Sequence, residues 1–501
     1  MNSQKKMMKT LFSSGISGTT SQVIVAAANL ISLPIIVSSL GKTEYGIWVL
    51  IGLSLQFLAM SDLGIINSVG RLVAKYKTKD TIESLRKLIT TVSILLAFIG
   101  IFISVCTFIA SFWIAQILNI DPADQAVAQK LFLIGGVFLG VTIPLRVGSG
   151  ILSGYQNYST INYSQSILSA INLASILVMS AIDQFGLVEL IFVYSINTLL
   201  IEIFRLYSSS KLFKLHLSLK YFSKSHMHEI FDLGSSSILT TLTAFGYRQG
   251  IVIATAHILG VIEAGIFGIC LVIINSISKL LSQLSIPIVT LVSEYSNSNS
   301  LKAIRGMNNT FVSISFGLAL CIFAGIVTYS QAILVHLFGN SDWTLNDYNT
   351  CHIALVIMSG SLAIGIPQMG ARSILLGGGQ HWFVARATFI GSFCSIIGAI
   401  ILVNTFGLFG AAIGWSIMWL LQGTFLYPPA IKKRLKQSYT NMLKNAYLPG
   451  VYSGVIVSIY LWSVSNWVNP VNLPELIFSI TLSVVLGISS LYISLKYYKR
   501  P

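Results

Sequence analysis

The sequence predicts an all-α polytopic membrane protein with about fourteen transmembrane helices, for reasons of composition, hydropathy and internal repetition. Hydrophobic residues make up 54% of the 501 positions and charged residues only 9%, and the mean hydropathy is +0.79. A soluble domain of this size could not bury so much apolar surface. Most of the chain is therefore expected to face lipid or other membrane helices.

Fourteen apolar runs follow one another with short polar gaps, and each is long enough to cross a hydrocarbon core of ~30 Å. We expect the spans at 11–39, 45–69, 88–114, 130–153, 160–182, 187–209, 231–258, 264–292, 308–337, 351–377, 382–404, 408–430, 447–467 and 475–495. The gaps leave no room for an extramembrane domain. Because a membrane glycosyltransferase or polymerase would need such a domain for its catalytic groups, this pattern argues against an enzyme.

An internal repeat divides the spans. The segment Leu40–Trp48 recurs as Leu259–Phe267 with five of nine positions identical, and Ile143-Pro144 recurs as Ile366-Pro367. Matches that keep their order over this length indicate duplication. Each copy carries a proline that permits helix bending at the same place.

The repeat predicts two six-helix lobes, at 1–220 and 221–435, and an appended pair, helices 13 and 14, at 436–501. Because six is even, both lobes start on the same membrane side and are parallel repeats. In transporters built this way the substrate path runs between the lobes, and we expect it there.

The positions of the basic residues predict orientation. Of 31 Lys and Arg residues, most lie in the tails and in alternate gaps, whereas only Lys42 and Lys130 lie in the opposite gaps. Since Lys and Arg are retained on the cytoplasmic side, both termini are expected in the cytoplasm. This distribution also explains the net charge of +15 without a nucleic-acid partner.

No cofactor or metal is expected. The five cysteines are scattered without metal-type spacing, so we interpret them as small packing residues. The run Gly377–Gly379 lacks the Lys-Ser or Lys-Thr that follows a phosphate-binding loop, which gives no sign of nucleotide hydrolysis.

Five basic residues lie in or beside the spans, and the first four of them are candidates for a substrate path: Arg146, Arg248, Lys279, Arg372 and Arg386. An uncompensated charge inside a membrane is costly and usually functional. For the first three, the alternatives are an interhelical ion pair or a carbonyl clamp; for Arg372 and Arg386 the alternative is an interface anchor. Our hypothesis is that Arg146, Arg248 and Lys279, with Arg372, guide an anionic cargo.

Two carboxylates stand out within the spans. Asp62 has an apolar repeat counterpart, Leu281, and a carboxylate confined to one lobe suits coupling to H⁺ or Na⁺. The alternative is that Asp62 pairs with Arg71 or a helix end. Glu202 and Arg205, three residues apart, are expected to form a local ion pair.

The segments Pro34–Gly46, Ser61–Gly64 and Arg71–Ala74 resemble the opening of the polysaccharide-unit flippases of the Wzx type. These belong to a superfamily of exporters for drugs, oligosaccharidyl lipids and polysaccharides. The resemblance implies a MATE-like fold in a bacterial cytoplasmic (inner) membrane. It also implies that undecaprenyl-pyrophosphate-linked oligosaccharide units move from the cytoplasmic to the outer leaflet.

Such units supply surface polysaccharides, for example the O-antigen of lipopolysaccharide or a capsule. The resemblance further implies alternating access, coupling to an ion gradient, and other polysaccharide-assembly proteins as partners. A cation-coupled multidrug exporter of the same superfamily is the alternative. The additional helix pair and the excess of bases over acids within the spans favour the anionic, lipid-linked cargo.

Overall fold

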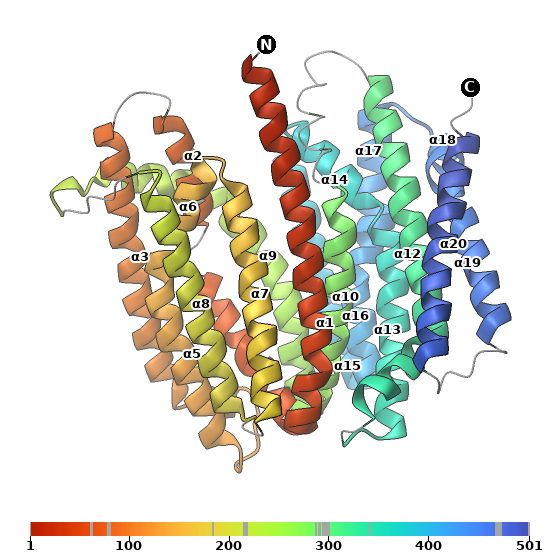
Figure 1. Cartoon of the computed structure of the whole chain (residues 1–501), viewed down its shortest axis with the longest axis horizontal. Coiled ribbons are helices and arrows are strands. Elements are labelled where there is room, and N and C mark those ends of the chain that lie inside the picture. The colour runs from red at the N-terminus through yellow and green to blue at the C-terminus, as the bar shows by residue number, and fades with distance from the viewer. Residues whose placement is uncertain are drawn as a thin grey trace. The chain divides into compact units, whose positions relative to one another are not determined.

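The computed structural model describes residues 2–60, 64–77, 82–182, 185–213, 219–285, 301–339, 342–465 and 473–498, together with Ile288 and Val292. Within these ranges the chain is helical and contains no strand (Figure 1). Twelve helical stretches are long and apolar enough to cross a membrane. The prediction of a polytopic all-α membrane protein is confirmed.

The count of fourteen spans stays a prediction. The first of the twelve stretches, Ser17–Ala59, contains a break at Gly41, and α9 (Lys224–Leu259) is a 36-residue helix outside the twelve. Helix α1 consists of two helical segments that meet at Gly41, the one residue inside it with non-helical dihedral angles (φ 77°, ψ 175°). A side chain is disfavoured at such a positive φ, and glycine is not.

The chain forms two compact units by internal contacts. Unit 1 comprises residues 1–245 and 260–265, and unit 2 comprises 246–259 and 266–501. The helix α9 thus begins in unit 1 and ends in unit 2. The predicted lobe boundaries, 1–220 and 221–435, stay a prediction.

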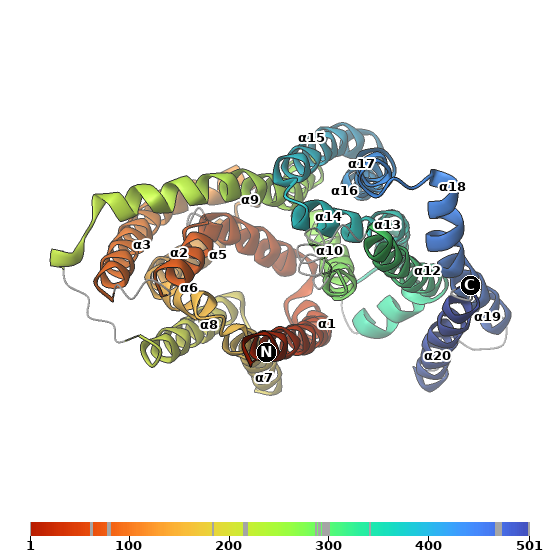
Figure 2. The same ribbon diagram turned by 90° about the horizontal axis from the view of Figure 1, so that it is seen from above.

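Among the described residues, unit 1 contains eight helices besides the starts of α9 and α10. They are α1 (Asn2–Ala59), α2 (Ile65–Lys77), α3 (Ile82–Ser111), α4 (Ile114–Ile117), α5 (Gln125–Leu145), α6 (Val147–Gly154), α7 (Tyr158–Ala181) and α8 (Leu187–Ser210), with a 3₁₀ turn η2 (Leu219–Tyr221). Seen end-on, α3, α2, α6 and α8 lie side by side in this order (Figure 2). Helix α5 packs against α3 and α8, and α7 packs against α1.

Small residues let these helices approach closely. A Cβ at Gly140 would lie 2.6 Å from the carbonyl oxygen of Gly100, and one at Gly100 would lie 2.2 Å from that of Gly140. Such contacts are the usual way in which membrane helices pack without a hydrophobic driving force. Between α2, α3 and α6 an apolar cluster includes Val69, Leu88 and Ile151.

Unit 2 contains α10 from Ile266 onward and the helices that follow. They are α10 (Val261–Gln283), α12 (Leu301–Phe338), α13 (Leu345–Gly365), α14 (Gln368–Gly377), α15 (His381–Phe406), α16 (Leu408–Leu421), the π-helix η3 (Gln422–Leu426), α17 (Tyr427–Leu435), α18 (Tyr439–Met442), the π-helix η4 (Leu443–Tyr447), α19 (Leu448–Ser465) and α20 (Leu473–Tyr498). The predicted appended pair corresponds to α19 and α20, which pack on each other and on α12.

Repeat-equivalent positions have matching backbone features. Gly41 and its counterpart Gly260 both have positive φ, 77° and 110°. The helix pair α5–α6 is interrupted after Pro144, and α13–α14 is interrupted at Pro367. Because proline removes a backbone donor and crowds the preceding turn, both breaks follow directly from the sequence.

Candidate functional site

Arg146 lies in unit 1 at the break between α5 and α6, one residue after the end of α5. Its guanidinium Nη1 donates a 3.0 Å hydrogen bond to the carbonyl oxygen of Ala59, the last residue of α1. A helix C-terminus leaves carbonyl groups without helical partners and carries partial negative charge. The structure thus contains the carbonyl clamp, and a role for Arg146 along the substrate path stays a prediction.

Arg248 lies on the part of α9 that belongs to unit 2, and its side chain is exposed. The preceding residue fixes this segment, since the buried Tyr247 hydroxyl donates a 2.8 Å hydrogen bond to the carbonyl oxygen of Trp415 on α16. The Tyr247 ring also stacks on that of Trp415, with centroids 6.2 Å apart. Tyr247 therefore holds the helix on which Arg248 is presented.

Lys279 is also exposed and lies on α10, close enough to Arg248 for the two positive charges to interact. Helix α10 ends at Gln283 rather than near 292 as predicted, so Lys279 lies one turn before its end. The depth of Lys279 within the membrane stays a prediction; along α10 it lies ~6 Å from the nearer helix end at 1.5 Å per residue. Within the described part of the chain, no ion pair involves Arg248 or Lys279.

Arg372 and Arg386 are exposed on α14 and α15 of unit 2. The Arg372 guanidinium lies close enough to the Tyr427 hydroxyl to interact with it electrostatically. Unit 2 therefore holds Arg248, Lys279 and Arg372, whereas Arg146 belongs to unit 1. A continuous track that includes all four stays a prediction.

Asp62, the predicted coupling residue, lies outside the described residues. The expected pair of Glu202 and Arg205 is confirmed, with 2.7 Å between Glu202 Oε1 and Arg205 Nη1. The structure adds partners from α7, because Arg205 also donates to Ser164 Oγ at 2.7 Å and to Gln165 Oε1 at 3.2 Å. Both charged residues are buried.

A second polar group joins the same two helices of unit 1. The Asn197 side-chain amide on α8 donates to Asn172 Oδ1 at 2.9 Å and to Ser175 Oγ at 3.3 Å on α7. Hydrogen bonds of this kind hold membrane helices together. These residues were not predicted from the sequence, where their only signal is the repeated occurrence of amide and hydroxyl side chains within two apolar runs.

A charged cluster at the start of α9 was also missed. Glu229 accepts hydrogen bonds from Lys75 and, at 2.7 Å, from the Tyr76 hydroxyl, both at the end of α2. Next to them His226 packs its ring 5.4 Å from that of Tyr76, and its Nδ1 lies 2.9 Å from Ser223 Oγ. We refer to Lys75, Tyr76, His226 and Glu229 as the α2–α9 cluster.

Burial and charge shift the pKa values in the α2–α9 cluster. Burial lowers the pKa of His226 below 6.5, although the Glu229 carboxylate opposes this shift. Burial alone would raise the pKa of Glu229, but hydrogen bonds from Lys75 and Tyr76 outweigh it, so the pKa lies below 4.5. Burial, with the hydrogen bond to Glu229, raises the pKa of Tyr76 to about 12. Neutral His226 and ionised Glu229 are thus the favoured forms.

No group of three or more His, Cys, Asp or Glu side chains suited to a metal ion occurs in the described ranges. The buried Cys270 and Cys351 thiols approach within 3.4 Å between α10 and α13. Both cysteines are free, and they pack two helices of unit 2 against each other.

Comparison with known proteins shows similarity to transporters and flippases rather than to enzymes. The chain is 25% identical over 211 residues to a probable low-salt glycan biosynthesis flippase, Agl15, of Haloferax volcanii. This match spans 41% of the chain and 42% of that protein, less than half of its length. No protein-family model matches the chain.

Solved structures resemble the chain over most of its length. A lipid II flippase MurJ in an inward closed conformation aligns with a TM-score of 0.71 at 15% identity, covering 97% of this chain and 98% of MurJ. An inward-facing multidrug resistance transporter of the MATE family aligns with a TM-score of 0.66 at 16% identity, covering 84% and 96%.

A transporter from Pyrococcus furiosus, described as having a binding pocket of reverse polarity, aligns with a TM-score of 0.61 at 16% identity and covers 85% of this chain and 96% of its own. At these identities the likeness concerns the fold alone. The resemblance found in the sequence is therefore confirmed as structural similarity to the MOP superfamily, to which the MATE transporter and the Pyrococcus protein are assigned, and as sequence similarity to a glycan flippase. The chain has the fold of MOP-superfamily transporters.

Proposed function

We propose that this protein is a flippase that moves lipid-linked oligosaccharide units across a membrane, from the cytoplasmic to the outer leaflet. The fold supports transport, and the similarity to a glycan biosynthesis flippase supports a lipid-linked glycan as the cargo. In this proposal the lipid is undecaprenyl pyrophosphate and the products serve surface polysaccharide biosynthesis in a bacterial inner membrane. Other polysaccharide-assembly proteins would supply and receive the cargo.

The observation that carries the proposal is the set of exposed cations on unit 2 within a membrane fold. Arg248, Lys279 and Arg372 are accessible, and none belongs to an ion pair among the described residues. A charged side chain that faced hydrocarbon would cost free energy. Accessible cations within the predicted spans therefore favour a water-filled path. A pyrophosphate is the kind of charge that such a path would attract.

Arg248 is the central residue of this set. It lies ~16 Å from the end of α9 at 1.5 Å per residue, close to the middle of a membrane of ~30 Å. Tyr247 fixes the helix at this depth through its bond to Trp415. Lys279 on α10, close enough to Arg248 for the two charges to interact, would bind the same part of the cargo, and Arg372 would extend the set from α14.

Alternating access driven by an ion gradient completes the proposal. Asp62 would bind H⁺ or Na⁺ in the N-terminal half, where protonation or ion binding favours one conformation over another. Both termini would lie in the cytoplasm, as the basic residues predict. We assign no catalytic residue, metal or cofactor to this function.

The test is complementation of a bacterial strain that lacks its own O-antigen-unit flippase. Expression of the protein should restore surface polysaccharide, and Arg248→Gln at equal membrane abundance should not. Lys130→Gln, a matched loss of one exposed cation, should restore it fully. If the strain instead gains only resistance to cationic drugs, the protein is a multidrug exporter.

A further inference from the structure

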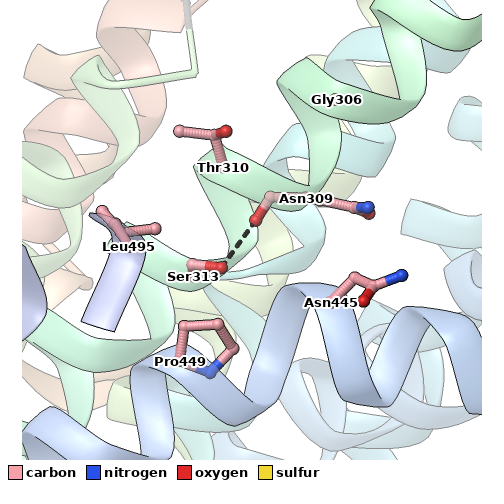
Figure 3. Close-up of a pocket in the computed structure, with 7 residues that line it drawn as sticks. All are labelled: Gly306, Asn309, Thr310, Ser313, Asn445, Pro449 and Leu495. Carbon is pink, nitrogen blue, oxygen red and sulfur yellow. Dashed lines mark hydrogen bonds between the residues drawn. The ribbon is translucent and has the colours of Figure 1, made fainter. Parts of the chain in front are cut away.

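A polar cavity of about 460 Å³ lies where the appended helix pair meets α12. Its lining comes from Gly306, Asn309, Thr310 and Ser313 on α12, Asn445 in η4, Pro449 at the start of α19 and Leu495 near the end of α20 (Figure 3). Amide and hydroxyl groups thus form about half of the lining, and Pro449 and Leu495 give it an apolar side. A cavity that is lined by such groups and not filled by the protein's own side chains can bind a polar ligand.

The cavity lies toward one end of these helices. Gly306 is in the second turn of α12 and Leu495 is in the last turn of α20. At 38 residues, α12 is ~57 Å long and exceeds the hydrocarbon core of ~30 Å, so its first turns extend into the headgroup region. Toward the membrane centre the gap closes, because a Cβ at Gly450 would lie 2.9 Å from Gly317 N.

The backbone around the cavity is unusual. Residues Leu443–Tyr447 form the π-helix η4, which includes Asn445. The single proton of the Ser313 hydroxyl is shared between two carbonyl oxygens, that of Ala446 at 2.6 Å and that of Asn309 at 2.8 Å. The contact with Ala446 joins α12 to η4, and the Asn309 and Asn445 amides lie at the same side of the cavity (Figure 3). Short π-helical segments such as η4 are often found at functional sites.

Three lysines neighbour lining residues along the chain and would form a basic rim around the cavity. Lys444 precedes Asn445, Lys496 follows Leu495, and Lys302 lies one helical turn before Gly306 on the same helix face. All three side chains are exposed. The sequence has no Asp or Glu at 301–313, 439–449 or 489–498. A neutral hydrogen-bonding interior with a basic rim matches a phosphate that carries a hydroxylated substituent.

We propose that this cavity binds the headgroup of a membrane lipid, with the phosphate at the lysine rim and hydroxyl groups on the Asn309 and Asn445 amides. The acyl chains would lie along the apolar side formed by Pro449 and Leu495. Two lipids share this chemistry, an anionic glycerophospholipid and a lipid-linked sugar phosphate. The appended helices thereby gain a role that does not depend on the cargo proposed above.

Two glycines on α12 offer a matched pair of variants. A Cβ at Gly306, and equally one at Gly325, meets no atom within 4 Å, so a larger side chain is tolerated at both positions. Gly306→Trp fills the cavity, whereas Gly325→Trp adds the same side chain on the same helix away from it. A second variant, Lys444→Gln with Lys496→Gln, removes rim charges without filling the space.

The experiment is native mass spectrometry of the full chain released from nanodiscs of phosphatidylglycerol and phosphatidylcholine in equal amounts. The wild type and Gly325→Trp should retain phosphatidylglycerol, and Gly306→Trp should lose it. The rim variant should retain about tenfold less, since each surface lysine contributes a few-fold in affinity for anionic lipid. Equal retention in all variants, or equal retention of phosphatidylcholine, would overturn the proposal.

A competition arm separates the two sources. An excess of undecaprenyl-pyrophosphate-linked sugar that displaces phosphatidylglycerol from the wild type identifies the cargo lipid as the natural occupant. If it does not displace phosphatidylglycerol, the natural occupant is a resident membrane lipid. If Gly306→Trp abolishes the retention of neither lipid, the cavity is not a headgroup site.

Discussion

The guanidinium of Arg146 donates a 3.0 Å hydrogen bond to the carbonyl oxygen of Ala59, 87 positions earlier in the chain. This bond joins the proline-associated break of α5–α6 to the end of α1. Two interruptions of unit 1 are thus held together by one side chain. A residue selected for its charge within a span therefore has a defined structural partner.

Replacing Arg146 with Ala should destabilise the protein. The Ala59 carbonyl would lose a charged donor in a partly buried hydrogen bond, a loss that costs ~1–3 kcal/mol. We expect a lower melting temperature for purified Arg146→Ala in detergent, and a smaller decrease for Arg146→Lys, which keeps the charge but not the planar group. An Arg146→Ala protein that melts at the wild-type temperature would show that the bond contributes nothing.

Replacing Arg248 with Gln should impair transport and leave stability nearly unchanged, because the side chain is exposed and belongs to no ion pair among the described residues. Loss of one charged hydrogen bond to a phosphate costs ~1.5–3 kcal/mol, so the rate of cargo movement should fall about tenfold or more. Lys279→Gln should act in the same direction. Wild-type rates in both variants, at matched abundance, would remove these cations from the path.

Asp62→Asn should uncouple transport from the ion gradient. The amide keeps the shape of the side chain but cannot bind and release a proton, and it binds Na⁺ less strongly. In vesicles with an imposed gradient, the variant should transport at the rate seen without one. If a gradient accelerates the variant as much as the wild type, Asp62 has no part in coupling.

Acidic pH should loosen the start of α9. The pKa of His226 is lowered by burial, so its stabilising contribution is complete above about pH 6.5 and is lost as the pH falls below that value. Glu229, whose pKa is also lowered, loses its contribution at more acidic pH, below about 4.5. Both changes act in the same direction.

Hydrogen exchange of peptides from the first turns of α9 measures this effect. Protection should decrease between pH 7 and 5.5 after correction for the intrinsic exchange rate, and His226→Gln should abolish most of that decrease. Peptides from α15, which lacks this cluster, serve as the internal control. A wild-type profile in His226→Gln would assign the pH response to another group.

Much of the helical architecture could be predicted from the sequence. The run 187–209 corresponds to α8 at Leu187–Ser210, and 382–404 corresponds to α15 at His381–Phe406. Apolar length and polar gaps determine such boundaries because the membrane requires continuous helices. The helix breaks at Pro144 and Pro367 were likewise predictable from the sequence, since proline cannot continue the helical hydrogen bonds.

The side-chain partners could not be predicted in the same way. Hydropathy gives the position of Arg146 along its own helix, but its bond to Ala59 depends on how two distant helices pack. The contacts of Arg205 with Ser164 and of Glu229 with Lys75 have the same origin. Only the Glu202–Arg205 pair was predictable, because a spacing of three residues brings two side chains to one helix face.

The most direct test of the account is flipping of a lipid-linked sugar by the purified protein. Proteoliposomes containing a fluorescent undecaprenyl-pyrophosphate-linked oligosaccharide are treated with a quencher that does not cross the membrane. With the wild type we predict that the protected inner-leaflet fraction becomes accessible over time, and that Arg248→Gln slows this about tenfold or more. Accessibility that does not exceed that of protein-free liposomes, under any ion gradient, would contradict the assignment of this protein as a flippase.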